Sequence, residues 1–347
     1  MKTNLTLTMT LKPLTAVVIL NWNGRRLLEE FLPSIVANTP AGVGRIIVAD
    51  NGSTDSSLEY LAKAYPGSEI DVMAFDRNYG FAEGYNKALL KLARQYRYAV
   101  LLNSDVAARE DWLSPLVAFM EANPDVGACA PKLLSYREPE KFEYAGASGG
   151  FLDRHGFPYC RGRIFNTCET DSGQYDDTID VDWATGAALM TRIDTYIEAG
   201  GLDADFFAHM EEIDLCWRMR RLGFRISVVP SSQLFHLGGG SLPPSDPRKT
   251  YLNYRNNLLM LHKNLAPEVR KGVLLRRRLL DTLSWGLNIV TGKWSATKAI
   301  VKAHNDFRNM RKDFEPRTDC ATAADRKPRP NIIIDYFIRK HHTFAEL

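Results

Sequence analysis

The segment Tyr98-Ala99-Val100-Leu101-Leu102-Asn103-Ser104-Asp105 joins five apolar residues to a polar tip. An apolar run of this length is typical of a strand buried on both faces, which leaves its sheet at the first polar residue. Open α/β sheets bind ligands at the carboxyl ends of their strands, so Asp105 stands where a ligand is expected. Carboxylate oxygens suit Mg²⁺ or Mn²⁺, metals that commonly accompany phosphates. The alternative is that Asp105 caps a helix near Asp111, and this segment alone favours neither interpretation.

Strand and helix patterns alternate at short intervals over residues 15–130. The strand-like runs are 16–20, 45–49, 70–75, 99–102 and 126–130, and the helical patterns lie around 25–37, 55–65, 81–96 and 111–122. This βαβα order predicts the α/β class, with a doubly wound, mostly parallel, Rossmann-like sheet and right-handed crossovers. Residues 131–181 lack clear periodicity and are expected to form an irregular excursion with short strands.

Four of the expected strands end in polar residues, and the carboxyl ends of parallel strands share one edge of a sheet. These tips are Asn21-Trp22-Asn23-Gly24, Asp50-Asn51-Gly52-Ser53, Asp76-Arg77-Asn78 and Asn103-Ser104-Asp105. We therefore expect them to line one crevice. Asp50 stands at a strand tip and could accept a hydrogen bond from a nucleobase, whereas Ser53 and Asp55 are better explained as helix caps. The first tip has no GxGxxG pattern, which argues against a dinucleotide-binding dehydrogenase.

Three carboxylates, Glu211, Glu212 and Asp214, fall within one turn of a helix expected to begin near residue 211. The helix dipole favours acidic residues at this end and accounts for one or two of them. Asp214 lies one turn before Arg218 and is able to pair with it. A third carboxylate beside the aromatic residues 206 and 207 would have a raised pKa and could act as a general base.

Two further places stay open between a structural and a functional role. His236 follows a strand and precedes three glycines, so it is either a metal or phosphate ligand or a structural histidine. The segment from Trp183 to Ala188 contains several small residues, Gly186 among them. It indicates either tight packing or a place where a substrate approaches the backbone.

The composition is that of an ordinary globular protein of 347 residues, 45% of them apolar. Its five cysteines never stand in a CxxC spacing, which argues against a disulfide framework or a zinc site and favours a reducing cytoplasm. No stretch reaches about 18 uninterrupted apolar residues, and Met1 to Pro13 lacks the pattern of a signal peptide. We therefore expect a cytoplasmic protein without a transmembrane helix.

Charge divides the chain unevenly. Residues 1–250 carry a net charge of −7, and the chain from Tyr251 onward carries +10, from 19 Lys and Arg against 9 Asp and Glu. We expect a catalytic body at 1–250, a basic helical region at 251–315, and a linker and C-terminal tail at 316–347. The basic region suits contact with phosphates or the inner face of an anionic membrane; otherwise it is a solvated appendage or a homodimer interface. Nucleic acid is not expected as a partner, because aromatic residues are not interleaved with these charges.

Taken in order along the chain, these motifs resemble those of the large inverting glycosyltransferase family 2, which has the GT-A fold, over about residues 15–261. They are VVILNWN (17–23), VADNGSTD (48–55), RNYGFAEGYN (77–86), LLNSD (101–105), GGLD (200–203), the acidic helix start at 211–215, His236, and Tyr254-Arg255-Asn256. The nearest likeness is to the rhamnosyltransferase-like branch, which builds bacterial surface polysaccharides.

The resemblance implies an enzyme that moves a sugar, rhamnose in that branch, from a nucleoside-diphosphate donor to a glycan or polyprenyl-diphosphate-linked acceptor. It implies that Asp105 and His236 bind Mg²⁺ or Mn²⁺, and that Glu212 is the base, with Glu211 and Asp214 as rivals. The implied donor-binding residues are Asn21, Asn23, Asp50, Asn51, Ser53, Arg77, Asn78, Asn86, Asn103 and Ser104; the implied acceptor-binding residues are Trp183, Gly186 and Arg255. The usual first Asp of the metal motif is Asn103 here, which removes one negative ligand.

The implied mechanism is a single inverting displacement, in which the base takes a proton from the acceptor hydroxyl. Two rival functions remain. A sugar nucleotidyltransferase would begin with a Gly-rich loop containing Arg and Lys, which residues 21–24 do not provide. A non-catalytic nucleotide- or glycan-binding module would not need the intact carboxylate cluster near residue 212.

Overall fold

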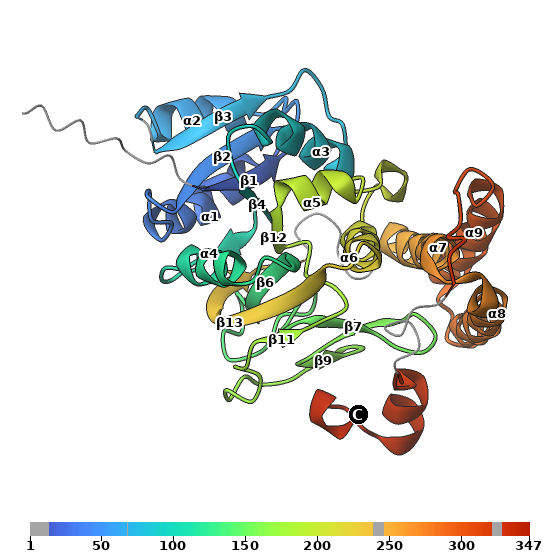
Figure 1. Ribbon diagram of the computed structural model, residues 1–347. Coiled ribbons are helices and arrows are strands. Elements are labelled where there is room, and N and C mark those ends of the chain that lie inside the picture. The colour runs from blue at the N-terminus through green and yellow to red at the C-terminus, as the bar shows by residue number, and fades with distance from the viewer. Residues whose placement is uncertain (1–13, 68, 239–245, 321–327) are drawn as a thin grey trace, which may run out of the picture.

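The computed structural model describes residues 14–67, 69–238, 246–320 and 328–347. The expectation for Met1 to Pro13 and most of the glycine run after Leu237 lie outside the described residues. A mixed nine-stranded sheet forms the centre of the molecule (Figure 1). Along its main path the strands are ordered β11-β13-β6-β12-β4-β1-β2-β3, and β5 pairs with β13. The strands are β1 (Thr15–Asn21), β2 (Gly44–Asp50), β3 (Ile70–Ala74), β4 (Tyr98–Leu102), β5 (Val106–Ala107), β6 (Val126–Ser135), β11 (Ile179–Asp180), β12 (Ala188–Arg192) and β13 (Arg225–His236).

The sheet is mostly parallel, as expected, and one antiparallel strand lies inside it. β1 runs parallel to β2 and β4, β2 to β3, and β6 to β13. β12 runs antiparallel to both β4 and β6, so those two strands point in the same direction. The carboxyl ends of β1, β2, β4 and β13 therefore meet at one edge. β12 begins at this edge, because Ala188 pairs with Leu102.

Helices cover both faces of the sheet, and three more pack beside it. The α-helices of the described residues are α1 (Arg25–Ala37), α2 (Ser57–Ala64), α3 (Phe81–Leu92), α4 (Leu113–Ala122), α5 (Ile193–Glu198), α6 (Glu211–Arg221), α7 (Pro247–Asn264), α8 (Pro267–Val290) and α9 (Trp294–Met310). α1 and α4 lie on one face, and α3, α5 and α6 on the other (Figure 1). Apolar residues at helical spacing, such as Leu28, Leu32 and Ile35 of α1, form the buried stripes that pack on the sheet.

The excursion at 131–181 begins as the end of β6 and then forms a small antiparallel sheet. Its strands are β7 (Gly150–Leu152), β8 (Pro158–Cys160), β9 (Arg163–Ile164) and β10 (Thr167–Cys168). Residues 328–347 fold back onto this sheet. The Phe344 ring lies 5.2 Å from that of Phe151, and the Tyr336 hydroxyl is 2.6 Å from Thr167 Oγ1. The part of the tail that the structure describes is therefore docked on the body.

The basic helical region consists of α7, α8 and α9, and α7 packs against both α6 and α9. Among the described ranges of the chain, no helix combines the length and the apolar character that crossing a bilayer requires.

Candidate active site

The tips of β1 and β2 are joined by a buried pair of polar side chains. Asn21 and Asp50 are neighbours in the strand register, and Asn21 Nδ2 donates to Asp50 Oδ1 at 2.9 Å. The other carboxylate oxygen of Asp50 accepts the Ser53 N–H at 3.0 Å. Within the described residues, Asn21 Oδ1 is buried and has no hydrogen-bond donor. Buried acceptors are normally paired, so this oxygen needs a donor that the described residues do not supply.

The other polar residues of these tips hold the loops together. Asn23 Oδ1 accepts the backbone N–H groups of Thr54 and Asp55 at 2.7 and 3.2 Å. Asn51 Nδ2 donates to Asn78 Oδ1 at 3.0 Å, which ties the β2 tip to the β3 tip. Arg77 follows β3, and its guanidinium lies 4.9 Å from the centre of the Tyr79 ring.

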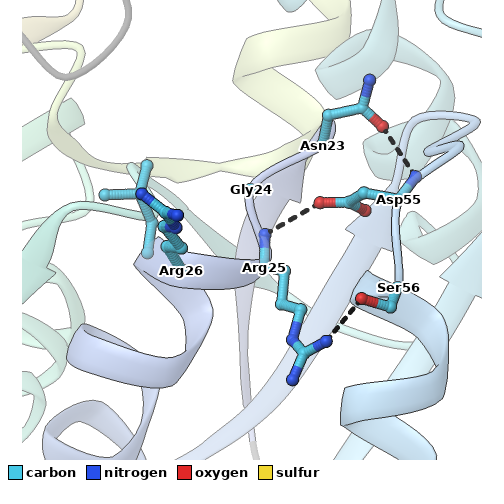
Figure 2. A pocket seen from close by; sticks show the side chains of 7 residues that line it. Asn23, Gly24, Arg25, Arg26, Asp55 and Ser56 are labelled. Carbon is cyan, nitrogen blue, oxygen red and sulfur yellow. Dashed lines mark hydrogen bonds between the residues drawn. The ribbon is translucent and has the colours of Figure 1, made fainter.

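An open pocket of about 480 Å³ lies beside the β1 tip (Figure 2). It is lined by Asn23, Gly24, Arg25, Arg26, Leu27, Asp55 and Ser56. Figure 2 shows the Arg25 guanidinium turned toward Ser56, whose Oγ accepts its hydrogen bond at 2.6 Å. The pocket is therefore rimmed by cationic side chains at the start of α1.

A buried histidine, His236 at the end of β13, lies between two carboxylates beside the polar tip that follows β4. His236 Nε2 is 3.1 Å from Asp105 Oδ1, and His236 Nδ1 is 3.2 Å from Glu143 Oε1. The pairing of β5 with β13 sets Asp105 beside His236, because Val106 is in register with His236. Burial disfavours the charged imidazolium, but Glu143 and then Asp105 outweigh burial and raise the pKa of His236 to about 10. Burial likewise disfavours the Asp105 carboxylate, yet His236 holds its pKa below the usual value.

The donor set at this tip fits a divalent cation. Two adjacent ligands of a six-coordinate Mg²⁺ are about 3 Å apart, and the Asp105 and His236 donor atoms are 3.1 Å apart. Glu143 stands behind the imidazole, in the place where metal-bound histidines usually donate their second N–H. Within the described ranges, no group of three or more His, Cys, Asp and Glu residues is arranged to hold a metal alone. A metal here would therefore complete its coordination with donor phosphates or water.

Glu143 was not anticipated from the sequence. It lies in the excursion at 131–181, where no periodic pattern assigns a residue to a strand or a face. Asn103 and Ser104 stand half-buried at the same tip as Asp105. The Asn103 N–H donates to Ala187 O at 2.9 Å, which joins this tip to the segment before β12.

The start of α6 follows a strained loop. Phe207, His209 and Met210 have φ values of 66°, 69° and 75°, in the left-handed region that residues other than glycine rarely adopt. Such conformations cost about 1 kcal/mol or more each and persist only where surrounding contacts impose them. The loop is therefore held in one geometry by its neighbours.

α7 supplies those contacts. Arg255 Nη2 donates to Asp205 O and Phe206 O at 3.0 and 2.9 Å, and Asn256 Nδ2 donates to three carbonyl oxygens of residues 206–209 at 2.8 Å. Arg255 was expected to bind the acceptor. The side chain is buried and its guanidinium donates to these backbone carbonyls, which argues against that role.

Glu212 and Glu211 stand together at the first turn of α6. The Oε2 atom of each is buried and, among the described residues, without a hydrogen-bond partner. Burial raises the pKa of Glu212 to about 7, and burial together with the Glu212 charge raises that of Glu211 well above its ordinary value. Glu211 is 5% exposed, whereas Glu212 is only partly buried. A Cβ on Gly186 would lie 3.5 Å from Glu212 Cδ, so this glycine leaves space beside the carboxyl.

Asp214 was a rival for the base, and its contacts argue for a structural role. Its side chain is completely buried; Oδ2 accepts from Arg218 at 2.8 Å and Lys263 at 3.0 Å, and Oδ1 accepts from Asn264 at 2.6 Å. Burial favours its neutral form, but Arg218 and then Lys263 keep its pKa below the usual value. The expected pairing with Arg218 is confirmed, and Asp214 joins α6 to α7.

Two further expected site residues make structural contacts. Trp183 is 2% exposed, its ring packs on Gly150, and its indole N–H donates to Phe151 O at 3.0 Å, which argues against a contact with an acceptor. Asn86 is half-buried; it donates to Leu202 O at 2.8 Å and accepts from the Tyr196 hydroxyl at 2.6 Å, so it joins α3 to the loop after α5.

Comparisons with known proteins agree with this arrangement. Residues 16–175 match the family model described as Glycosyl transferase family 2. The chain is 25% identical over 225 residues to the N-acetylglucosaminyl-diphospho-decaprenol L-rhamnosyltransferase of Mycobacterium tuberculosis, covering 60% of this chain and 71% of that protein. It is 26% identical over 217 residues to the rhamnosyltransferase WbbL of Escherichia coli, covering 60% and 79%.

Solved structures give the same fold. The mannosyltransferase PcManGT of Pyrobaculum calidifontis, in complex with GDP-Man and Mn²⁺, superposes with a TM-score of 0.54 at 14% identity, over 86% of this chain and 88% of that one. The GT-A fold expected from the motifs is therefore confirmed.

Proposed function

We propose that this chain acts as a family 2 glycosyltransferase, the family whose model it matches over residues 16–175. It would transfer a sugar to an acceptor hydroxyl by one inverting displacement with Glu212 as the base. One observation carries the proposal. Glu212 is a carboxyl with a pKa of about 7, partly exposed beside Gly186, and its Oε2 atom has no hydrogen-bond partner among the described residues. A base with such a pKa is half ionised at neutral pH and still takes up a proton readily.

The position of Glu212 supports its proposed role as the base, because contacts connect it to the polar tip after β4. Gly186 lies against the Glu212 side chain, and the next residue, Ala187, accepts the Asn103 N–H. Gly186 and Ala187 thus connect the Glu212 side chain to Asn103, at the same strand tip as Asp105. An acceptor hydroxyl beside Glu212 would be close to a donor held at the β4 tip. Glu211 is the remaining rival, and its deeper burial makes it the weaker base candidate.

The donor is proposed to lie along the tips of β1, β2 and β4. Asn21 Oδ1 offers a buried acceptor to a nucleobase N–H, and Asp50 fixes the Asn21 amide that presents it. Asp105 and His236 would hold Mg²⁺ or Mn²⁺; the metal would displace the proton that His236 carries without it, and Glu143 would stand 3.2 Å behind the imidazole. When bound, such a metal offsets the negative charge that grows on the departing diphosphate.

The names of the relatives suggest which sugar and acceptor to try first. Two of them are rhamnosyltransferases, and one name specifies a decaprenyl-diphosphate-linked N-acetylglucosamine. We propose L-rhamnose, carried by a nucleoside diphosphate, as the sugar that is transferred. We propose a glycan on a polyprenyl diphosphate as the acceptor, within surface polysaccharide synthesis.

A transfer assay tests these assignments. The protein would be incubated with Mn²⁺, a panel of nucleoside-diphosphate sugars and a short polyprenyl-diphosphate N-acetylglucosamine. We expect the L-rhamnose donor to give a disaccharide of inverted anomeric configuration by NMR. A retained configuration would overturn the single displacement. Formation of a nucleotide sugar from a nucleoside triphosphate and a sugar 1-phosphate would instead identify a nucleotidyltransferase.

A further inference from the structure

The outward face of α8 carries a continuous apolar ridge that no part of the described chain covers. Leu275, Leu279, Leu283, Leu287 and Val290 are 59%, 61%, 70%, 64% and 85% exposed. Their spacing of three or four residues places them on one side of the helix, over a length of about 22 Å. Apolar patches of this extent on a folded protein mark a surface that meets a partner or a membrane.

The opposite face of α8 is already used for packing. Val273, Arg277 and Asp281 are buried there, and Arg277 forms an ion pair with Asp281 at 3.2 Å. The Arg277 guanidinium also lies 3.7 Å from the centre of the Phe157 ring, in the loop before β8. The orientation of α8 is therefore fixed by polar and aromatic contacts, and the leucines face outward as a result. α8 lies at the outer edge of the C-terminal helices (Figure 1).

Basic side chains border the ridge on both sides. Arg276 lies along one flank, and Lys271 and Arg278 lie along the other; all three are exposed. From Leu275 to the end of α8, the acidic side chain is that of Asp281, which is buried. The turn into α9 adds an exposed Lys293 and a Trp294 that is 60% exposed. Tryptophan and lysine are typical of the level where a bilayer meets water.

We propose that α8 lies in the plane of an anionic lipid surface. The leucine ridge would enter the boundary between headgroups and acyl chains, and Lys271, Arg276, Arg278 and Lys293 would contact lipid phosphates. A second copy of the chain fits less well, because α8 packed on α8 would bring the two basic flanks together without compensating acids. This proposal concerns binding alone and does not depend on the reaction.

Vesicle sedimentation at low salt tests the proposal directly. The probes are vesicles of phosphatidylcholine and vesicles of an equal mixture of phosphatidylcholine and phosphatidylglycerol. We expect the protein to sediment with the mixed vesicles. The double variant Leu279→Glu, Leu283→Glu should lower the partition coefficient about tenfold or more. Arg276→Gln with Arg278→Gln should lower it about fivefold for each cation removed, on the anionic vesicles only.

Leu90→Glu is the matched control, because Leu90 of α3 is 62% exposed and lies far from α8 in the sequence. It should bind vesicles like the unaltered protein, and unfolding curves of all variants should coincide closely. Equal vesicle binding by the α8 double variant and the unaltered protein would overturn the proposal. A dimer by light scattering that the same double variant dissociates, with no vesicle binding, would identify a second copy as the occupant of the ridge.

Discussion

At the scale of single residues, burial and neighbouring charges give the three carboxyl groups in the first turn of α6 different pKa values. Asp214 is ionised because Arg218 and Lys263 face it. Glu211 and Glu212 have no such cation among the described residues, so burial raises both pKa values. One motif thus supplies a structural anion and, in the proposed mechanism, the proton acceptor. The partly exposed member, Glu212, is the one that a substrate can reach.

The raised pKa of Glu212 predicts the pH dependence of activity. Below pH about 7 the carboxyl is protonated and cannot accept the acceptor's proton, so kcat/KM should rise about tenfold per pH unit up to that pH and then level off.

The stability of the fold should change with pH in the opposite direction. The unfolded group has a pKa of 4.5, so the contribution to the free energy of unfolding is full below that pH and is lost as pH rises through about 7. A kcat/KM that stays constant from pH 5 to 8 would contradict the assignment.

Glu143 gives a prediction for the metal site. Glu143→Gln removes the charge behind His236 and should weaken Mn²⁺ binding about 10- to 100-fold, measured by calorimetry with a nucleoside diphosphate present. Glu138→Gln is the matched control, since Glu138 lies in the same excursion but pairs with Lys141 at the surface. Equal affinities in the two variants would show that Glu143 does not support the metal.

At the scale of elements, α7 acts as a clamp on the start of α6. Its Arg255 and Asn256 satisfy the backbone carbonyls of a loop that contains three left-handed residues. Lys263 and Asn264, two turns later, hold Asp214 on α6 itself. The basic helical region thus supports the start of α6, where the proposed base lies, and its charge alone did not indicate this role.

Asn256→Ala tests this clamp. The variant leaves two partly buried carbonyls, those of Ala208 and His209, without their side-chain donor, because Arg255 still donates to Phe206 O. The free energy of unfolding should therefore fall by about 1–3 kcal/mol. Because the α6 start would loosen, kcat should fall more than donor affinity. Asn38→Ala is the control, since Asn38 also donates to two backbone carbonyls but lies at the end of α1. If both variants lower kcat equally at a temperature where both are folded, the clamp has no role in positioning Glu212.

At the scale of the whole molecule, the part of the site built from strand tips was predictable from the sequence. Apolar runs of five to seven residues must be buried strands, and parallel strands bring their polar ends to one edge; Asp50 and Asp105 follow from that rule. Glu143, Trp183 and Arg255 do not follow from it. Their roles depend on contacts between segments far apart in the chain, and a local pattern does not show whether a polar side chain faces a crevice or a backbone carbonyl.

The central claim is that Glu212 takes the proton from the acceptor. The most direct test compares Glu212→Gln with Glu211→Gln in sugar transfer, with donor binding measured by calorimetry on the same preparations. Glu212→Gln should lower kcat by about 100- to 10,000-fold while donor affinity stays within about twofold, and Glu211→Gln should retain most of the turnover. Near-normal turnover by Glu212→Gln, with loss in Glu211→Gln, would contradict the account and move the base one residue along α6.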